Sequence, residues 1–355
     1  MPNLILPGRR LRRRWQTIAF AVIAVLLALA PARGFAQTFM YISDGNFVDL
    51  YNFSTHTLNG SFISVTSATG VAVDSTGNVY VGSTDLPDGG SGIMKYNGTT
   101  GAQIGAGPFV GYEGHNDSGP DPIDVTNPAG MKFSTSGNLY VADESGASNV
   151  HIYSSTGVSQ GNLTGGDLTS PTGVAFDSGG NLVAVGGGYV ARSLGATAPF
   201  TDLVAPGTGG SPPNGNLTNP ISVAVRSNGQ IYVIDTSNSG GNGAVLRFNS
   251  DGSFDTDLIQ FTTFVPADLS FGPDGLLYVS GIDIESNLGE ILAYSKDGAF
   301  VQAVISGGFS SNAGPTFFVA IPEPSTWMLP SLLGLLLLLA RKRLGRLPFA
   351  ILPAA

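Results

Sequence analysis

Residues 127–143 read Asn-Pro-Ala-Gly-Met-Lys-Phe-Ser-Thr-Ser-Gly-Asn-Leu-Tyr-Val-Ala-Asp, and variants of this stretch recur along the chain. Each variant has a short apolar run, a turn with glycine and a second apolar run that usually contains tyrosine. Glycine reaches the positive φ angles that a tight hairpin turn requires, and short apolar runs bounded by turn residues are typical of β-strands. The recurring stretch therefore predicts a β-hairpin.

The hairpins repeat in a fixed register. A glycine comes seven residues after the first position of each unit, and a tyrosine or valine comes ten residues after it. The units are spaced 43 to 60 residues apart, which is the range of β-propeller blades. The first positions are Gly70, Gly130, Gly173, Ser222 and Asp268, and the turn glycines are Gly77, Gly137, Gly180, Gly229 and Gly275.

The unit predicts the inner strands of a blade. We expect residues 71–73 and 79–81 to form the first two strands, buried between neighbouring blades. A third strand ends in an aromatic residue, and a glycine turn follows it. The fourth strand is less distinct, and residues 186–200 depart most from the pattern. The aromatic residues are Tyr96, Tyr153, Phe248 and Tyr294.

The two ends of the repeat region predict a closed ring. Residues 40–44 match the second strand of the unit and 47–51 match its third strand, but no first strand precedes them. The missing pattern occurs at 315–320, which carries the proline and the apolar residues of a first strand. We therefore expect an all-β, six-bladed propeller closed by strands from both ends, an arrangement that leaves only short edges exposed. The alternative is that 315–320 is a linker.

Composition and charge restrict the partners. The chain has no cysteine, so its core must hold the fold without disulfides. Between residues 37 and 321 there are 6 Lys or Arg and 24 Asp or Glu, which gives a net charge of −18. This charge argues against nucleic acid as a partner, and it permits divalent cations or cationic polymers.

The N-terminal segment has the layout of a secretory signal peptide. Several arginines precede an apolar stretch at 18–30, and a small-residue site ends at Ala36. We expect residues 1–36 to form a signal helix that signal peptidase removes. The alternative is an uncleaved membrane anchor, for which the apolar stretch is short.

The C-terminal segment has three parts in order. Pro322, Glu323, Pro324 and Ser325 precede the apolar run 327–340. At about 1.5 Å per residue, that run makes a short transmembrane helix that suits transient anchoring in the inner membrane. A basic stop follows the run and would stay on the cytoplasmic side. Its residues are Arg341, Lys342 and Arg343.

This tail resembles the PEP-CTERM sorting signal of Gram-negative bacteria, over residues 322–346. The resemblance implies recognition by an exosortase. The additional tail at 347–355 departs from the pattern, and the alternative is an ordinary single-pass anchor. The repeat resembles NHL-type repeats, most clearly at 127–157 and 219–252. That resemblance implies a six-bladed propeller over 37–321, in a family with binding platforms and a few enzymes.

The loops at one end of the blades carry the candidate site. Loops between second and third strands share a face with loops that enter the next blade, and here both sets are acidic. We expect a rim that binds through carboxylates, with Ca²⁺ as a candidate ligand. The alternative is that these residues cap turns. The principal candidates are Asp44, Asp143, Asp235 and Asp283, and the neighbouring ones are Asp85, Asp88, Glu144, Glu285 and the loop 105–127.

No catalytic motif stands out. Three histidines without cysteines or paired spacing do not make a zinc site, and there is no nucleophile elbow. We therefore expect an exported, non-catalytic binding module at the cell surface, outer membrane or extracellular matrix. Its expected partner is a polysaccharide or a surface protein. The alternatives are a lactonase- or lyase-like propeller enzyme and a purely structural protein.

Overall fold

The computed structural model describes residues 37–87, 89–111, 125–145, 149–208, 217–237, 242–307, 309 and 315–320. In these residues the strands form six four-stranded sheets, the blades of a β-propeller. We number the strands of each blade from the central channel outward, and Thr38–Val319 make up one compact unit.

The first three blades are built as follows. Blade 1 contains β24 (Pro315–Ala320), β1 (Gln37–Asp44), β2 (Phe47–Asn52) and β3 (Thr57–Ser64). Blade 2 contains β4 (Ala68–Val73), β5 (Asn78–Ser83), β6 (Gly92–Asn97) and β7 (Val110–Gly111). Blade 3 contains β8 (Pro128–Phe133), β9 (Leu139–Asp143), β10 (Asn149–Tyr153) and β11 (Ser159–Leu163).

The remaining three blades follow the same order. Blade 4 contains β12 (Gly173–Phe176), β13 (Leu182–Gly186), β14 (Tyr189–Ser193), the short 3-10 helix η1 (Leu194–Ala196) and β15 (Thr201–Val204). Blade 5 contains β16 (Pro220–Val225), β17 (Ile231–Asp235), β18 (Ala244–Phe248) and β19 (Phe254–Gln260). Blade 6 contains β20 (Phe264–Phe271), β21 (Leu277–Asp283), β22 (Leu288–Tyr294) and β23 (Phe300–Ser306).

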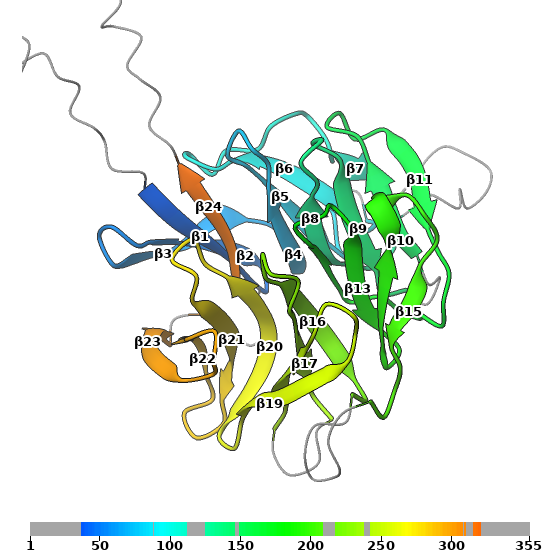
Figure 1. The fold of residues 1–355 in the computed structure, drawn as a ribbon. Helices are drawn as coiled ribbons and strands as arrows, with labels where there is room; N and C mark the ends of the chain where they lie inside the picture. The colour runs from blue at the N-terminus through cyan, green and yellow to red at the C-terminus, as the bar shows by residue number, and fades with distance from the viewer. Residues whose placement is uncertain are drawn as a thin grey trace, which may run out of the picture. The chain divides into compact units, whose positions relative to one another are not determined.

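Both ends of the repeat region contribute to blade 1, as the sequence predicts. Strand β24 lies beside β1, so the last described strand completes the sheet that begins the propeller (Figure 1). Side chains close the ring at the same place, because Met40 and Ile42 of blade 1 pack with Tyr278 and Ile291 of blade 6. The prediction of six blades and of a shared blade is confirmed.

The core lies between blades. Six apolar clusters each join two neighbouring blades, and the second strands supply residues to both sides. In β5, Val79 and Val81 pack toward blade 1 whereas Tyr80 packs toward blade 3, as the two-residue period of a strand requires. Both faces of a second strand are therefore buried, which explains its continuous apolar run.

The repeated tyrosine joins blades through its hydroxyl. Tyr41 donates to the Gly98 carbonyl of blade 2 at 2.7 Å, Tyr140 to Ala196 of blade 4 at 3.1 Å, and Tyr232 to Lys296 of blade 6 at 3.2 Å. In blades 2 and 6 the equivalent tyrosines bond within their own blade. Tyr80 donates to Asp74 at 3.1 Å, and Tyr278 donates to Asp274 at 2.7 Å.

First strands start earlier than the sequence predicts. Strand β4 begins at Ala68 rather than at residue 71, and its pairing with β5 shifts register between Ala68 and Val71. The same shift follows Pro128, Pro220 and Pro266 in β8, β16 and β20. Proline has no N–H to donate to the ladder and is tolerated at such an irregularity, and the shift at Ala68 shows that the irregularity does not require proline.

The predicted signal helix (residues 1–36) and the predicted helix of the sorting tail (327–340) lie outside the described residues. Within the part of the chain that the structure describes, no helix is long and apolar enough to cross a membrane.

Candidate binding channel

Asp143, at the end of β9, is buried and bonded to its own loops. The side chain is 1% exposed, and its carboxylate accepts hydrogen bonds from the N–H groups of Thr126, Asn127 and Ser145 at 3.1, 3.0 and 3.0 Å. It therefore ties the loop that enters blade 3 to the turn that follows β9.

Asp235, at the end of β17, has the same arrangement in blade 5. It is fully buried and accepts from the Thr218 hydroxyl at 3.1 Å and from the N–H groups of Asn219 and Ser237 at 3.2 and 2.9 Å. Blade 2 places Ser83 at this position, where its hydroxyl donates to the Thr66 carbonyl at 2.7 Å.

A sequence signal marks this arrangement. Thr-Asn-Pro precedes both buried aspartates, with the threonine 17 residues before the carboxylate. The link between this threonine and the aspartate was not predicted from the sequence.

Hydrogen bonding keeps Asp143 ionised. Burial alone would raise its pKa, but the neighbouring His151 side chain and the hydrogen bonds from Thr126 and Ser145 outweigh burial and hold the pKa well below its usual range. His151 is also buried, and its Nε2 lies 3.3 Å from the carboxylate. The pair lies inside blade 3.

Asp44 and Asp283 are partly exposed at the ends of β1 and β21. Asp283 accepts from the N–H groups of Ser286 and Glu285 at 2.7 and 3.1 Å, and these bonds lower its pKa. The four predicted aspartates thus lie at the same end of four blades without meeting in one cluster. Among the described residues, no three His, Cys, Asp or Glu side chains are grouped so that they could hold a metal ion. Asp88 and residues 112–124 of the predicted loop lie outside the described residues.

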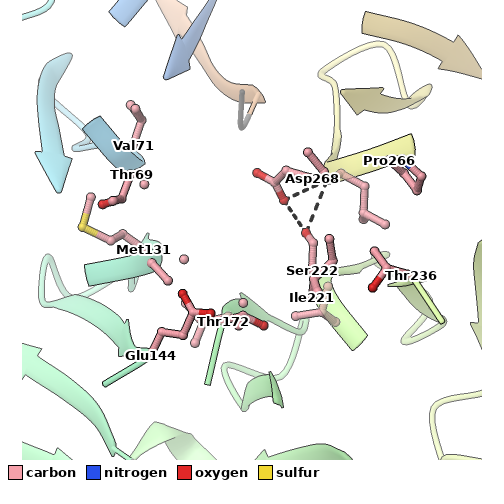
Figure 2. A pocket seen from close by; sticks show the side chains of 18 of the residues that line it. Thr69, Val71, Met131, Glu144, Thr172, Ile221, Ser222, Thr236, Pro266 and Asp268 are labelled. Carbon is pink, nitrogen blue, oxygen red and sulfur yellow. Dashed lines mark hydrogen bonds between the residues drawn. The ribbon is translucent and has the colours of Figure 1, made fainter. Parts of the chain in front are cut away.

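The first strands of blades 2 to 6 surround a cavity of about 500 Å³. Figure 2 shows it with Thr69 and Met131 on one side, Ser222 and Asp268 on the other, and Thr172 between them. The cavity reaches the loop end of the blades, because Glu144 and Thr236 also line it. Each of these two residues directly follows a buried aspartate, so Asp143 and Asp235 fix the turns that present them.

Glycine brings neighbouring first strands into backbone contact. A Cβ added to Gly70 would lie 1.8 Å from the Ala129 carbonyl oxygen, and one added to Gly130 would lie 2.7 Å from that of Thr172. The Gly130 N–H also donates to the Thr172 carbonyl at 2.8 Å. Blades 5 and 6 replace this glycine with Ser222 and Asp268, so their first strands meet through side chains.

Ser222 and Asp268 form a hydrogen-bonded pair in the channel wall. The Ser222 hydroxyl donates to Oδ1 of Asp268, and the Leu269 N–H donates to the same Oδ1 at 2.8 Å. The Leu269 N–H also reaches the Ser222 oxygen at 3.3 Å. Figure 2 shows the Asp268 carboxyl group directed into the channel.

Lys132 on β8 lines the same cavity. Burial lowers the pKa of Lys132, and the charge of Asp268 raises it in part. Burial likewise raises the pKa of Asp268, against the lowering effects of the Ser222 bond and the Lys132 charge. Each group is partly exposed to the channel and remote from bulk water, so burial acts against the charged form of both.

Lys132, Ser222 and Asp268 were not predicted as site residues. The signal was their departure from the repeat. The first position is otherwise glycine, and the third position, occupied by Lys132, is alanine at 72, 175 and 224 and serine at 270. Chemically, the described part of the channel wall offers the Lys132 amine, the Asp268 carboxyl group with its hydroxyl partner, the Glu144 carboxyl group at the loop end and apolar side chains. This arrangement suits binding of a small polar molecule.

The chain is similar to several solved structures. The chain is similar to TolB from Acinetobacter baumannii, with a TM-score of 0.56 and 15% identity over 88% of this chain and 74% of that one. It also matches a gluconolactonase from Xanthomonas campestris (TM-score 0.48, 14% identity, 71% and 89% covered). A third match is a virginiamycin B lyase from Staphylococcus aureus (TM-score 0.45, 14% identity, 80% and 75% covered).

At these identities the similarity concerns the fold alone. No protein-family model matches the chain, and no curated protein matches it. The NHL-type and PEP-CTERM resemblances therefore remain predictions from the sequence.

Proposed function

We propose that this chain is an exported, non-catalytic β-propeller that binds an extracellular polysaccharide or surface protein at the loop end of its blades. Signal peptidase would remove residues 1–36. An exosortase would recognise Pro322–Ser325 while the apolar run 327–340 and the basic stop hold the chain in the inner membrane. The mature protein would reach the cell surface, outer membrane or matrix.

The position of the propeller supports this route. Strand β1 begins at Gln37, directly after the expected cleavage site, and β24 ends at Ala320, before Pro322. The expected processing segments lie outside the described residues, so their removal would cut none of the described strands.

The cavity carries the binding proposal. It is of the size typical of ligand sites, and it reaches the loop end through Glu144 and Thr236. The turns that present these two residues are fixed by the buried Asp143 and Asp235. Fixed turns reduce the entropy that binding would otherwise cost.

Fractionation tests the sorting step. The full chain and a Pro322→Ala/Pro324→Ala variant would be produced in a Gram-negative host with an exosortase, and an exosortase-deficient host serves as control. We expect the parent at the surface or in the medium with its C-terminus processed, and the variant in the inner membrane. Equal distribution of parent and variant would contradict exosortase sorting.

Polymer binding tests the binding role. The protein recovered from the host would be titrated with dextran, chitosan and alginate, which are neutral, cationic and anionic. We expect retention of at least one polymer and weaker retention by Glu144→Gln. Shortening of a polymer or opening of a lactone by the parent protein would instead favour the enzyme alternative.

A further inference from the structure

We infer that the central channel binds a neutral, polyhydroxylated ligand, a sugar unit whose hydroxyl groups lie between Lys132 and Asp268. This inference rests on the proposed binding function and names the class of ligand. It places that ligand deeper than the rim aspartates, among the first strands.

The chain's own repeats indicate that the fold does not require Lys132. Blades 2, 4 and 5 build the third position with Ala72, Ala175 and Ala224, which are all buried, whereas blade 3 places Lys132 there. An alanine thus satisfies the same backbone environment. A lysine that is remote from bulk water and that the fold does not require is costly unless a ligand or partner compensates its charge.

The carboxylate of Asp268 is oriented for a further hydrogen bond. Among the described residues, its protein hydrogen bonds are to Oδ1, from Ser222 and the Leu269 N–H. Oδ2 belongs to the same group, which Figure 2 shows directed into the channel. Because Ser222 and Leu269 hold the carboxylate in one orientation, Oδ2 is a preorganised acceptor.

The charges favour a hydroxyl over an ion. Lys132 on β8 of blade 3 and Asp268 on β20 of blade 6 both line the cavity, so a ligand in it faces a donor and an acceptor. A lone anion would meet the carboxyl groups of Asp268 and Glu144, and a lone cation would meet Lys132, so neither ion is complementary to every polar group of the wall. A hydroxyl group accepts from one and donates to the other.

The rest of the wall suits a sugar ring. Val71, Met131, Val174, Val223 and Leu269 line the cavity beside the polar residues. These side chains would cover the C–H faces of a ring while its hydroxyls reach the charged pair. A cavity of about 500 Å³ holds a small ligand of this kind.

Calorimetric titration of the full chain with cellobiose tests the inference, with glucuronate and glucosamine as charged comparisons. We expect millimolar or tighter binding of cellobiose and weaker binding of both charged sugars. Lys132→Ala and Asp268→Asn should each weaken cellobiose binding at least tenfold. The exposed ion pair Lys296–Asp297 supplies the controls, because Lys296→Ala and Asp297→Asn should leave the affinity unchanged.

A thermal melt separates a binding role from a structural one. Lys132→Ala restores the residue of three other blades, so we expect its melting temperature to equal or exceed that of the parent. The inference would be overturned by a lower melting temperature of Lys132→Ala with parental affinity, by cellobiose binding that neither variant weakens, or by the absence of cellobiose binding. If dextran, chitosan or alginate still binds when cellobiose does not, the proposed function survives and only the channel inference fails.

Discussion

Single carboxylates hold the loop end of the propeller together. Asp143 and Asp235 each accept hydrogen bonds from backbone N–H groups of two loops. Without these carboxylates, the buried N–H donors would lack partners. Their role is to position Glu144 and Thr236, and this role follows from burial that the sequence alone does not reveal.

The pKa of Asp143 predicts how stability depends on pH. Its folded-state pKa lies below the unfolded value of about 3.9, so its stabilising effect is present above that pH and is lost as the pH falls through the folded pKa. We expect Asp143→Asn to lower the free energy of unfolding at pH 7 by about 2 kcal/mol. The difference from the parent should shrink as the pH falls from about 5 toward about 2.

Urea unfolding of both proteins at several pH values checks this prediction. Asp251→Asn is the matched control, because Asp251 also accepts a backbone N–H, from Ser253 at 3.0 Å, but lies in an exposed turn. The free energy of unfolding of Asp251→Asn should differ little from that of the parent. A constant difference between Asp143→Asn and the parent at every pH would mean that the lost charge is not the cause.

Residue patterns predict some roles better than others. The turn glycines were predictable, because Gly77, Gly137 and Gly229 all have positive φ angles, of 85°, 86° and 88°. The roles of Asp143 and Asp268 were not, because the same carboxylate can cap a turn, hold a cation or face a channel. Only its three-dimensional neighbours distinguish these roles.

At the scale of elements, the turn between third and fourth strands is where one blade touches the preceding one. Gly252 has φ 85°, and a Cβ there would lie 2.2 Å from the Leu203 carbonyl oxygen of blade 4. Gly137 has nearly the same φ, but a Cβ would meet nothing within 4 Å. Comparing alanine substitutions at the two glycines therefore separates the cost of a left-handed backbone, which both share, from the cost of close approach, which only Gly252 has.

We expect Gly137→Ala to cost about 1 kcal/mol of stability, from the left-handed backbone alone. Gly252→Ala should cost about 1–3 kcal/mol more, because the added methyl group must push blades 4 and 5 apart. Chemical denaturation of the two variants beside the parent measures both costs. Equal losses would show that the turn at Gly252 can move without disturbing its neighbour.

The inner elements were easier to predict than the outer ones. Second strands such as β9 and β17 are buried throughout, so they appear in the sequence as apolar runs. Fourth strands such as β11 are largely exposed, and Ser159–Leu163 contains one fully buried residue. Their pairing with the third strand, rather than their composition, makes them strands.

At the scale of the whole molecule, ring closure was predictable because a strand was missing at one end and an extra one was present at the other. The channel was not, because its lining depends on which first strands meet across the axis. The repeat identifies the strands of each blade, and the residues that depart from the repeat identify candidate site residues. In this chain, the residues that depart from the repeat in the first strands include Lys132 and Asp268.

Closure predicts that a short C-terminal strand stabilises the entire propeller. Deleting Pro315–Ala320 removes β24 and leaves the inner edge of β1 without its partner, although β1 also packs against blade 6. The six interblade clusters form a cycle, so opening one interface exposes the next. We expect a loss comparable with the whole stability of a domain, about 5–15 kcal/mol.

A thermal melt of the full chain and of the deletion variant measures this loss, and removal of residues 347–352 is the control of equal length. Hydrogen exchange would show where the deletion destabilises the propeller, because protection of the amides should fall first in β1 and β21, on either side of the opened interface. A deletion variant that melts with the parent would mean that interblade packing closes the ring without β24. In that case the shared blade would be a consequence of closure and not its cause.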